Sequence, residues 1–510
     1  MKPTVQQMQD IQQWLSGVAP AGAELVSDSR KVKAGDVFFA YPGDAADGRA
    51  YIEQALENGA SAVLYESHRF TWDGSWSGAH RAVSGLKQLS GQIAHTYYGQ
   101  ADHGMLVVAV TGTNGKTSCT QWLGHALSHL GQTTGVIGTL GTGIYSHGQR
   151  GAFEETGNTT PDALLLQQAL SSMRQQGVSA LAIEASSIGL EQGRMNGTHV
   201  DIALFTNFTR DHLDYHGDEQ HYEAAKRILF DWPGLQQAVI NLDDAMGLRL
   251  VKHLQQKSAA IPLIGYTCEA LAAPPGVAVL RASAIRTNAG GTAFHVDSPF
   301  GSAQVKTHLV GQFNVSNALG ILGVLLAKGV AWVAALHAIE LLVAVPGRMQ
   351  QFGGHDAPLI VIDYAHTPDA LEKTLNTLRQ VAQQRHGGLW CVFGCGGDRD
   401  PGKRPQMGAV AELADHVIVT SDNPRSEEPG AIIAQILAGM KAPQAAQALE
   451  DRAAAILWAV RHAGKADVVL LAGKGHETYQ EIKGKKLPFL DADHTALALA
   501  ARATMKGGNI

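Results

Sequence analysis

The chain has 510 residues, of which 45% are hydrophobic and 17% are charged, and its formal net charge is −6 at pH 7. Because hydrophobic cores stop growing at roughly 250 to 300 residues, this length predicts several domains, and we expect three. The slightly acidic charge, without long runs of one sign, argues against a nucleic-acid-binding or membrane-binding protein.

Residues 1–100 alternate short apolar runs with helical patterns, and we assign them to a first domain. The runs at residues 36–40 and 61–65 are expected strands. The opening residues are polar and amphipathic, without the charged and apolar regions of a signal peptide, so we expect a cytoplasmic protein. The polar stretch 97–104 marks the first boundary.

From Met105 onward, a strand, a glycine-rich turn and a helix follow one another repeatedly, and we assign residues 101–345 to a central domain. This alternation favours a mostly parallel sheet with helices on both faces. The apolar stretch 315–345 is interrupted by charged residues and predicts buried helices, not a membrane span. Strands are expected at 106–110, 178–183, 200–205 and 238–241, and a helix at 117–130.

A second series of strands and helices begins near Leu359, after the Pro346-Gly347 pair that marks the second boundary. Residues 346–510 therefore form the expected third domain. The expected fold class is α/β in three domains, with a central domain built on a parallel sheet and a Rossmann-like C-terminal domain. Strands are expected at 359–362, 389–393, 416–420 and 468–471, and a helix at 368–384.

The cysteines do not form a recognisable zinc or redox motif. Their spacings match neither a zinc knuckle nor a C-x-x-C pair. We expect buried, reduced thiols, as in cytoplasmic proteins, at Cys119, Cys268, Cys391 and Cys395.

A phosphate-binding loop is predicted where an apolar strand runs into Gly112-Thr-Asn-Gly-Lys-Thr117 and then a helix. Glycines let backbone N–H groups converge on an anion, Lys116 reaches the outer phosphates, and the Thr117 hydroxyl binds Mg²⁺. The general pattern has another glycine where Val110 stands, so the match is partial, and the alternative is a glycine-rich turn without a ligand. The loop predicts that the central domain is a phosphate-loop (P-loop) ATPase domain. The expected ATP-binding residues of the loop are Gly112, Thr113, Asn114, Gly115, Lys116, Thr117 and Ser118.

Polar groups follow the next two strands at their carboxyl ends, where open α/β sheets bind ligands. Glu184 ends one strand and is a candidate Mg²⁺ ligand; the alternative is a structural glutamate paired with a basic group. The next strand leads into a turn that carries Asp211, His212, Asp214 and His216. Any of these four could instead cap the following helix. The cluster as a whole is therefore stronger evidence for a functional site than any single member.

Seven motifs together resemble those of the Mur ligases, in the same order and over nearly the whole chain. They are Gly112-Thr-Asn-Gly-Lys-Thr117, Asn158-Thr-Thr-Pro161, Glu184-Ala-Ser-Ser187, Thr206-Asn-Phe-Thr-Arg-Asp-His-Leu-Asp-Tyr-His216, Tyr222-Glu-Ala-Ala-Lys226, Gly311-Gln-Phe-Asn-Val-Ser-Asn317 and Asp363-Tyr-Ala-His-Thr-Pro368. The resemblance implies an ATP-dependent, amide-bond-forming ligase of peptidoglycan precursor synthesis. In such enzymes ATP phosphorylates a substrate carboxylate, an amine attacks the acyl phosphate, and phosphate leaves.

The resemblance also implies cofactors and catalytic residues. Two Mg²⁺ ions are expected, bound through Thr117, Glu184 and His212. Lys226 is implied to be carbamylated by CO₂, which turns a cation that repels Mg²⁺ into an anion that binds it. From the residues alone, Lys226 is an ordinary lysine on a helix surface. Lys116, His212 and Lys226 are the expected catalytic residues.

The family uses the segment around Asn314 and Asn317 near adenine, although both residues could simply cap a helix. Arg348 and Asp363 are implied to reach the nucleotide from the third domain, so that domain closure completes the site. Two residues depart from the family pattern: Asp44 and Ile188 stand where a histidine is common. The implied UDP-substrate residues are Ser27, Ser29, Asp44, Ala45, Ala46, Asn158, Thr159, Thr160, Ser186, Gln192 and Arg194, with helix capping as the alternative for Thr160.

The amino acid that the resemblance implies is meso-2,6-diaminopimelate, joined to a UDP-linked muramoyl dipeptide. An arginine in Asp422-Asn-Pro-Arg425 can hold its distal carboxylate bidentately, and lysine-adding relatives lack that arginine. The implied contacts are Arg399, Asp422, Asn423, Pro424, Arg425, Gly473 and Glu477. The alternatives are a lysine-adding relative, a folylpolyglutamate synthetase-like ligase, and an inactive nucleotide-binding scaffold. We expect a monomer whose partners are the three small-molecule substrates.

Overall fold

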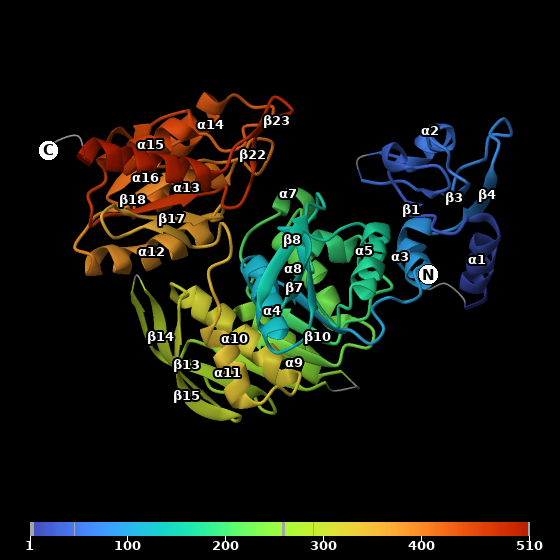
Figure 1. Ribbon diagram of the computed structural model, residues 1–510, viewed down its shortest axis with the longest axis horizontal. Coiled ribbons are helices and arrows are strands. Elements are labelled where there is room, and N and C mark those ends of the chain that lie inside the picture. Colours follow the sequence, from blue (N-terminus) through green and yellow to red (C-terminus); the bar gives the residue numbers. More distant parts are fainter. Residues whose placement is uncertain (1–4, 45, 258–260, 289, 508–510) are drawn as a thin grey trace.

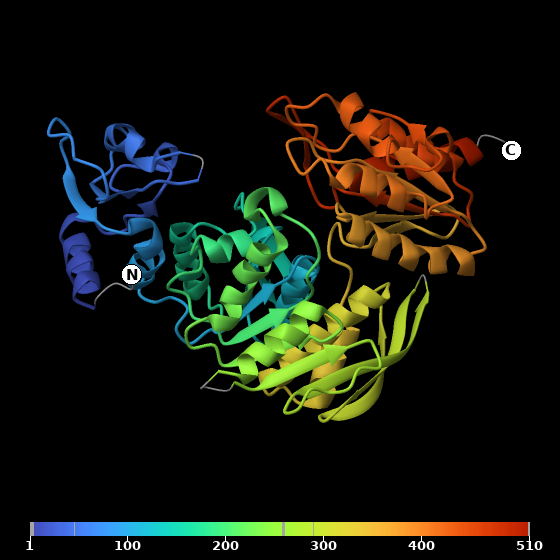
Figure 2. The same ribbon diagram turned by 180° about the vertical axis from the view of Figure 1, so that it is seen from behind.

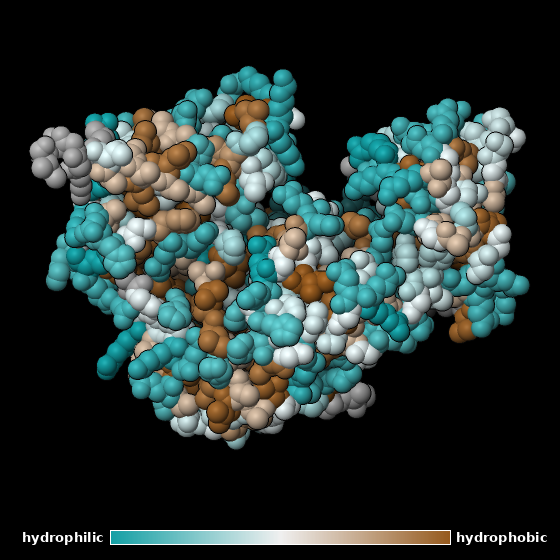
Figure 3. Space-filling view, in the orientation of Figure 1, coloured by the Kyte–Doolittle hydropathy of each residue, from teal (hydrophilic) through white to brown (hydrophobic). Residues whose placement is uncertain are grey.

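The structure is a computed structural model that describes residues 5–44, 46–257, 261–288 and 290–507. Figures 1 and 2 show three bodies, with the first and the last on opposite sides of the central one. A hollow with a mostly hydrophilic rim separates these two outer bodies above the central one (Figure 3). The division at residues 100/101 and 345/346 remains our proposal for the domain limits, and both points lie between regular elements.

The N-terminal domain is a four-stranded parallel sheet in the order β1-β2-β3-β4. Phe38 and Phe39 point to opposite faces of β2, and both are fully buried because helices and loops cover both faces. The expected strands at 36–40 and 61–65 are confirmed as β2 and β3. The elements are α1 (Val5–Val18), β1 (Leu25–Val26), β2 (Val37–Ala40), α2 (Ile52–Glu57), β3 (Ala62–Glu66), β4 (Ala79–Val83) and α3 (Leu86–Tyr97).

The described part of the central domain contains an eleven-stranded sheet, ordered β15-β14-β13-β12-β11-β10-β5-β9-β6-β7-β8. Its middle, from β13 to β6, is parallel, as predicted, and antiparallel strands extend both edges. The four expected strands are confirmed as β5, β9, β10 and β11. The strands are β5 (Leu106–Thr111), β6 (Thr134–Gly138), β7 (Gly141–Ser146), β8 (Gln149–Glu154), β9 (Ala180–Glu184), β10 (Ile202–Phe205), β11 (Gln237–Asn241), β12 (Leu263–Thr267), β13 (Ala278–Asn288), β14 (Gly291–Ser298) and β15 (Gly301–Thr307).

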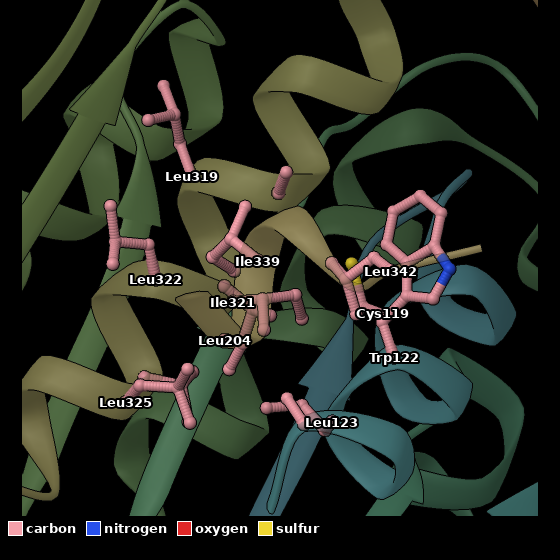
Figure 4. Close-up of a cluster of buried hydrophobic side chains, with 14 of the residues drawn as sticks. Cys119, Trp122, Leu123, Leu204, Leu319, Ile321, Leu322, Leu325, Ile339 and Leu342 are labelled. Atoms are coloured by element: carbon pink, nitrogen blue, oxygen red, sulfur yellow. The ribbon is translucent and has the colours of Figure 1, made fainter. Parts of the chain in front are cut away.

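Helices cover both faces of this sheet. On one face α4, α10 and α11 share a buried apolar cluster that includes Cys119, Leu204 and Leu322 (Figure 4). This packing fixes α4, and with it the loop that precedes α4. The helices are α4 (Lys116–His129), α5 (Ala163–Gln175), α6 (Ser187–Glu191), α7 (Leu213–His216), α8 (Glu219–Arg227), α9 (Ala245–Gln255), α10 (Gln312–Ala327) and α11 (Trp332–Glu340).

The apolar stretch 315–345 forms two helices, and the prediction that they are buried is confirmed only for α10, which is apolar around its whole circumference and is surrounded by the sheet, α4 and α11. The second helix, α11, is only partly buried, and its Val333 is exposed. Among the helices within the described residues, none combines the length and the apolar character that a membrane crossing requires. The described cysteines are free thiols; Cys119, Cys391 and Cys395 are buried, whereas Cys268 is only partly buried.

The C-terminal domain has a six-stranded sheet in the order β16-β17-β21-β18-β19-β20, parallel except for β16. The four strands and the helix expected here are confirmed as β17, β18, β19, β21 and α12. Its elements are β16 (Gln350–Gly353), β17 (Leu359–Asp363), α12 (Pro368–Gln384), β18 (Leu389–Phe393), α13 (Lys403–Ala411), β19 (His416–Val419), α14 (Pro429–Leu437), β20 (Gln447–Ala448), α15 (Arg452–His462), β21 (Val468–Ala472), the hairpin β22 (Tyr479–Ile482) and β23 (Lys485–Pro488), and α16 (Asp491–Gly507).

A buried carboxylate joins the first two domains. Asp102 is 0% exposed, and its oxygens lie 2.6 Å from His95 Nε2 of α3 and 2.8 Å from His199 Nδ1, just before β10. Burial opposes ionisation of Asp102, but hydrogen bonds from both histidines outweigh it and hold its pKa well below the usual range. Hydrogen bonds to Asp102 and Asp201 raise the pKa of His199 to about 10. The joint is therefore an ion pair at neutral pH.

Candidate active site

The phosphate loop lies between β5 and α4, against the carboxyl end of β10. Gly112 has φ 149° and Gly115 has φ 86°. A Cβ on Gly112 would lie 1.9 Å from Thr206 Oγ1, which leaves no room for any other residue. Thr206 in turn donates to the carbonyl oxygen of Asn114 at 2.6 Å. The loop conformation is thus fixed by its contacts with β10.

A cavity of about 650 Å³ opens above the loop, which is the size of a small-molecule or cofactor site. Its walls come from the central and the C-terminal domains. Most of the predicted nucleotide and metal residues line it together: Thr113, Asn114, Gly115, Lys116, Thr117, Ser118, Glu184, His212, Lys226, Asn314, Asn317, Arg348 and Asp363. The glycine-rich turn therefore borders a cavity large enough for a ligand. Gly112 is the exception within the loop, because only its backbone lies beneath the cavity wall.

Glu184 is fully buried at the end of β9 and faces this cavity. Its carboxylate accepts hydrogen bonds from Thr117 Oγ1 at 3.1 Å, from the Thr139 N–H at 2.9 Å and from Thr139 Oγ1 at 3.0 Å. No ion pair to Glu184 forms in the described part of the chain, so the alternative of a structural salt bridge is wrong. The hydrogen-bond donors to this carboxylate are two hydroxyls and an N–H, and the Lys116 ammonium of the loop lies near enough to interact with its charge.

Lys226 is 1% exposed at the end of α8, and the alternative of an ordinary surface lysine is wrong. Its Nζ donates to the Gly112 carbonyl oxygen at 2.9 Å and lies 4.2 Å from the centroid of the Tyr222 ring. Burial, reinforced by the nearby Lys116, lowers its pKa well below the ordinary value. Burial also lowers the pKa of Lys116, whose Nζ donates to the carbonyl oxygens of Gly112 and Thr113.

His212 adopts a left-handed backbone conformation with φ 52°, unusual for a residue other than glycine. Its side chain is partly exposed to the cavity, and its Nε2 lies 3.5 Å from Asp211 Oδ2. Desolvation by the cavity walls lowers its pKa, and Asp211 opposes this effect only in part. His212 occupies the N-cap position of α7, but its side chain makes no capping hydrogen bond. The side chain of Asp218 caps α8, so helix capping does not explain the cluster at Asp211, His212, Asp214 and His216.

Two groups from beyond Pro346-Gly347 line the cavity, and one of them contacts the loop. Arg348 donates to Thr117 Oγ1 at 3.2 Å, and its guanidinium carbon lies 4.3 Å from the Tyr364 ring centroid. Asp363, at the end of β17, accepts from the N–H groups of Met349 and Ala365 and so shapes the same turn. Burial raises the pKa of Asp363.

The capping alternative for Asn314 and Asn317 is also wrong. Gly311 occupies the N-cap position of α10, and no side chain caps this helix. Asn314 instead donates to the Val310 carbonyl oxygen at 2.9 Å, while Asn317 packs against the Cβ position of Gly115. Both asparagines therefore present their remaining polar atoms at the cavity wall.

Five of the predicted UDP-substrate residues meet where the first two domains face each other. Gln192 contacts the Asp44 carboxylate of the N-terminal domain, and Arg194 donates to Gln192 Oε1 at 2.9 Å and to the Thr160 carbonyl oxygen at 2.9 Å. Thr160 Oγ1 lies 2.9 Å from Ser186 Oγ. Thr160 does not cap α5, because the side chain of Asp162 does so.

The remaining members of this predicted set lie in other surroundings. Ser29 is buried and donates to Gln54 Oε1 at 2.7 Å, within the N-terminal domain. Asn158 and Ala46 are exposed, and Thr159 lies 3.2 Å from Thr139 beside the Glu184 carboxylate. A hydrogen bond links Ser27 to Tyr41, whose pKa is raised to about 12, chiefly by burial. Ala45 lies outside the described residues.

The predicted amino-acid residues form a cluster at the carboxyl ends of β19 and β21. Asn423 donates to Glu477 Oε2 at 2.7 Å, and a Cβ on Gly473 would lie 2.6 Å from Asp422 Oδ2. Arg425 also has a left-handed backbone, with φ 51°, and donates to the Gly397 carbonyl oxygen at 2.8 Å. Pro424 is buried beneath this turn, whereas Arg399 is exposed at its edge.

The sequence reasoning missed several residues of these walls. Thr139 follows β6, a short Gly-rich strand that was not predicted, and only the fold reveals its bonds to Glu184. Tyr364 and His366 line the cavity and were within a quoted motif. Burial and the nearby Lys403 lower the pKa of His366 to about 4, so its ring is neutral at pH 7. The sequence reasoning also missed Lys474, which stands between two glycines without any other signal of a role.

Comparison with known proteins gives matches along nearly the whole chain. Three family models match: the Mur ligase family catalytic domain at residues 24–79, the Mur ligase middle domain at 110–325, and the Mur ligase glutamate ligase domain at 347–475. A UDP-N-acetylmuramoyl-L-alanyl-D-glutamate–2,6-diaminopimelate ligase of Janthinobacterium sp. (strain Marseille) is 64% identical over 507 residues, 99% of each chain. A relative of the same name from Coxiella burnetii is 46% identical over 93% of this chain and 95% of its own.

Solved structures give the same result. One ligase of that name is 38% identical, with a TM-score of 0.65 over 94% of this chain and 95% of its own. MurF from Acinetobacter baumannii, at 18% identity and a TM-score of 0.65 over 98% of each chain, shows that the fold is shared. The chain belongs to the Mur ligase family.

Proposed function

We propose that this protein is an ATP-dependent ligase that joins meso-2,6-diaminopimelate to UDP-N-acetylmuramoyl-L-alanyl-D-glutamate during peptidoglycan precursor synthesis. The observation that carries the proposal is the gathering of the predicted nucleotide and metal residues around one cavity, in a chain 64% identical to a ligase of that name. ATP would occupy the cavity above the phosphate loop, the UDP-dipeptide the face toward the N-terminal domain, and the amino acid the C-terminal cluster.

ATP activates the substrate carboxylate in this proposal, because a free carboxylate is a poor electrophile. The γ-phosphoryl group passes to the carboxylate and ADP leaves; the amine then attacks the carbonyl carbon, and phosphate departs from the tetrahedral intermediate. Lys116 contacts the outer phosphates, and Arg348 approaches the same charge from the C-terminal domain. Contact between Arg348 and Thr117 supports a role of the C-terminal domain in covering the acyl phosphate from water.

The residues beside the loop fit Mg²⁺. Thr117 and Glu184 offer the hard oxygen donors that Mg²⁺ prefers, and the walls of the described chain hold no cluster of three or more His, Cys, Asp or Glu that would form an all-protein cage. Mg²⁺ typically takes one or two carboxylates together with substrate phosphates. Bound there, it would offset the charge between the triphosphate and the carboxylate. We assign His212 to the second ion.

Lys226 is chemically suited to the carbamate that the family resemblance implies. Carbamate formation requires a neutral amine, and burial keeps Lys226 in that form more readily than an exposed lysine. The carbamate would replace the hydrogen bond to Gly112 by an anion directed at the cavity that Glu184 also faces. A buried anion there needs a cation beside it, which is consistent with the proposed Mg²⁺.

The UDP-dipeptide is assigned to the junction of the first two domains. Arg194 provides a fork of N–H donors for a phosphate or carboxylate, and its remaining donors lie next to Gln192 and Thr160. Burial lowers the pKa of Arg194, which nevertheless stays charged at neutral pH. Asp44 stands where the family often has histidine, and here it contacts both Gln192 and Lys87.

A single assay tests the proposal. Purified protein is given ATP, Mg²⁺ and the UDP-muramoyl dipeptide, and phosphate release is measured with diaminopimelate or with L-lysine. We expect release that depends on both the dipeptide and diaminopimelate. Release with lysine instead would support the lysine-adding alternative, and release with neither amino acid would reject the proposal.

A further inference from the structure

Lys474 is a fully buried lysine within the amino-acid cluster, and no role has yet been given to it. It is 0% exposed and lies on the turn directly after β21. Its Nζ donates to Glu477 Oε2 at 3.0 Å, to Asn423 Oδ1 at 3.3 Å and to the Tyr479 carbonyl oxygen at 2.6 Å. These three bonds use all the donors that an ammonium group has.

The partners of Lys474 are themselves connected to one another. Asn423 Nδ2 donates to the same Glu477 oxygen at 2.7 Å, and Asn423 Oδ1 also accepts from the Glu481 N–H at 2.9 Å. Lys474 therefore ties the turn after β19, the turn after β21 and the start of β22 into one network. Because these hydrogen bonds hold the Asn423 amide and the Glu477 carboxylate, the rotamers of both side chains are fixed before any ligand binds.

The charges in this cluster are arranged for a cation. Asp422 and Glu477 provide two carboxyl groups, and Lys474 provides one ammonium, so one negative charge is left over when all three are ionised. Burial and the nearby Asp422 hold the pKa of Glu477 above its ordinary value, and Lys474 and Asn423 offset this rise only in part. Tyr364 and Arg452 also face this carboxyl group. Without Lys474, each of the two buried carboxyl groups would disfavour the ionisation of the other more strongly.

We propose that Lys474 is a positioning residue for the amino-acid substrate: it holds Asn423 and Glu477 in place and keeps Glu477 ionised to receive the substrate's distal ammonium group. This inference deepens the proposed function and rests on it. The opposing interpretation is a purely structural lysine that stabilises the domain and has no specific effect on the amino acid.

The test compares variants by steady-state kinetics. Lys474→Met keeps the length of the side chain and removes its charge; we expect the KM for diaminopimelate to rise roughly 10- to 100-fold, the effect of losing a charge-assisted hydrogen bond, with the KM for ATP little changed. Lys465→Met is the matched control, because Lys465 is an exposed lysine of the same domain paired with Asp356. It should behave as wild type. A parallel rise in both KM values for Lys474→Met would overturn the inference.

The pH profile separates positioning from stability. At acidic pH, kcat/KM for diaminopimelate falls as Glu477 becomes protonated; this fall is the acidic limb of the profile. If Lys474 keeps Glu477 ionised, the acidic limb lies at higher pH in Lys474→Met than in wild type. In Lys474→Arg it stays near the wild-type position. Glu477→Gln should abolish that limb. An acidic limb that persists in Glu477→Gln would overturn the inference even if Lys474→Met does not fold.

A double variant completes the design. In a Glu477→Gln background, Lys474→Met should add little further loss, because the lysine acts through that carboxyl group. Full additivity of the two losses would contradict the inference. Failure of the wild-type protein to release phosphate with diaminopimelate would instead reject the proposed function, so the two failures are distinguishable.

Discussion

Arg348 donates to Thr117 Oγ1 across 3.2 Å, and this bond joins the C-terminal domain to the phosphate loop. Arg348 follows the Pro346-Gly347 connection directly, and its guanidinium packs over Tyr364, which belongs to the same domain. Any rotation of the C-terminal domain about this connection therefore moves a fixed positive charge relative to the nucleotide site.

Replacing Arg348 by alanine should weaken ATP use. Loss of a charged contact to phosphate costs about 1.5 to 3 kcal/mol, so we expect kcat/KM for ATP to fall at least about tenfold. Steady-state phosphate release at varied ATP measures this effect. Arg461→Ala, at an exposed position of α15, is the control and should leave the value unchanged. A wild-type kcat/KM in Arg348→Ala would remove Arg348 from the proposed site.

Replacing Lys226 by alanine should abolish most turnover, and added bicarbonate should not restore it. Alanine lacks the amine that would combine with CO₂ at this position. Turnover is measured by phosphate release with all substrates saturating. Lys252→Ala, on the exposed face of α9, should retain wild-type turnover. Near-normal turnover in Lys226→Ala would contradict the assignment of a carbamate there.

Chelation of Mg²⁺ should stop phosphate release, and Glu184→Gln should raise the Mg²⁺ concentration that gives half-maximal rate. The amide keeps the shape of the carboxylate but removes the charge that attracts the ion. A magnesium titration of the initial rate measures the change. Glu57→Gln, in the N-terminal domain, should titrate as wild type. An unchanged titration in Glu184→Gln would show that Glu184 does not contact the metal.

Arg425→Ala should reduce the preference for diaminopimelate over lysine. A site built around a charged hydrogen bond rejects an analogue lacking the partner by roughly 10⁴, so the alanine variant should lose most of that ratio. The ratio of kcat/KM for the two amino acids measures it, while the KM for ATP serves as the internal reference. Arg379→Ala, which removes an exposed pair with Asp415, should preserve the ratio. An equal loss for both amino acids and for ATP would mean that Arg425 is structural.

The ion pair between Asp102 and His199, which joins the first two domains, predicts that the stability of the fold depends on pH. The pKa of His199 is raised from 6.5 to about 10, so its contribution is fully present below about pH 6.5 and is lost as the pH rises through about 10. His199→Gln should therefore lower the melting temperature at pH 6.5 and approach wild type near pH 10. Thermal unfolding at several pH values measures the difference, with His221→Gln, at an exposed site, as the control. A constant difference across this range would contradict the ion pair.

Much of the fold followed from local pattern. The apolar runs that became β5, β17 and β18 are continuous, because parallel strands covered on both faces need no polar side. The antiparallel edges β7–β8 and β13–β15 were missed, since their half-exposed residues mix polar and apolar types without a strong signal. Their pairing depends on contacts with the rest of the sheet.

Residues of the candidate site could be predicted where they belong to a contiguous sequence motif, as Lys116 and Glu184 do. Burial of Lys226 was not predictable, because α8 alone has the composition of an exposed helix and only packing beneath the phosphate loop hides its last turn. At Thr160 only the capping alternative is wrong: Asp162 caps α5, and Thr160 bonds to Ser186 instead.

The left-handed backbones of His212 and Arg425 have a consequence for protein engineering. Such a conformation costs a residue other than glycine of order 1 kcal/mol or more, so glycine at either position should raise the resistance of the fold to heat. Directed evolution under thermal selection alone would consequently favour replacements at these two positions. The resulting enzymes would survive heating and yet have lost the side chains that the proposed chemistry needs.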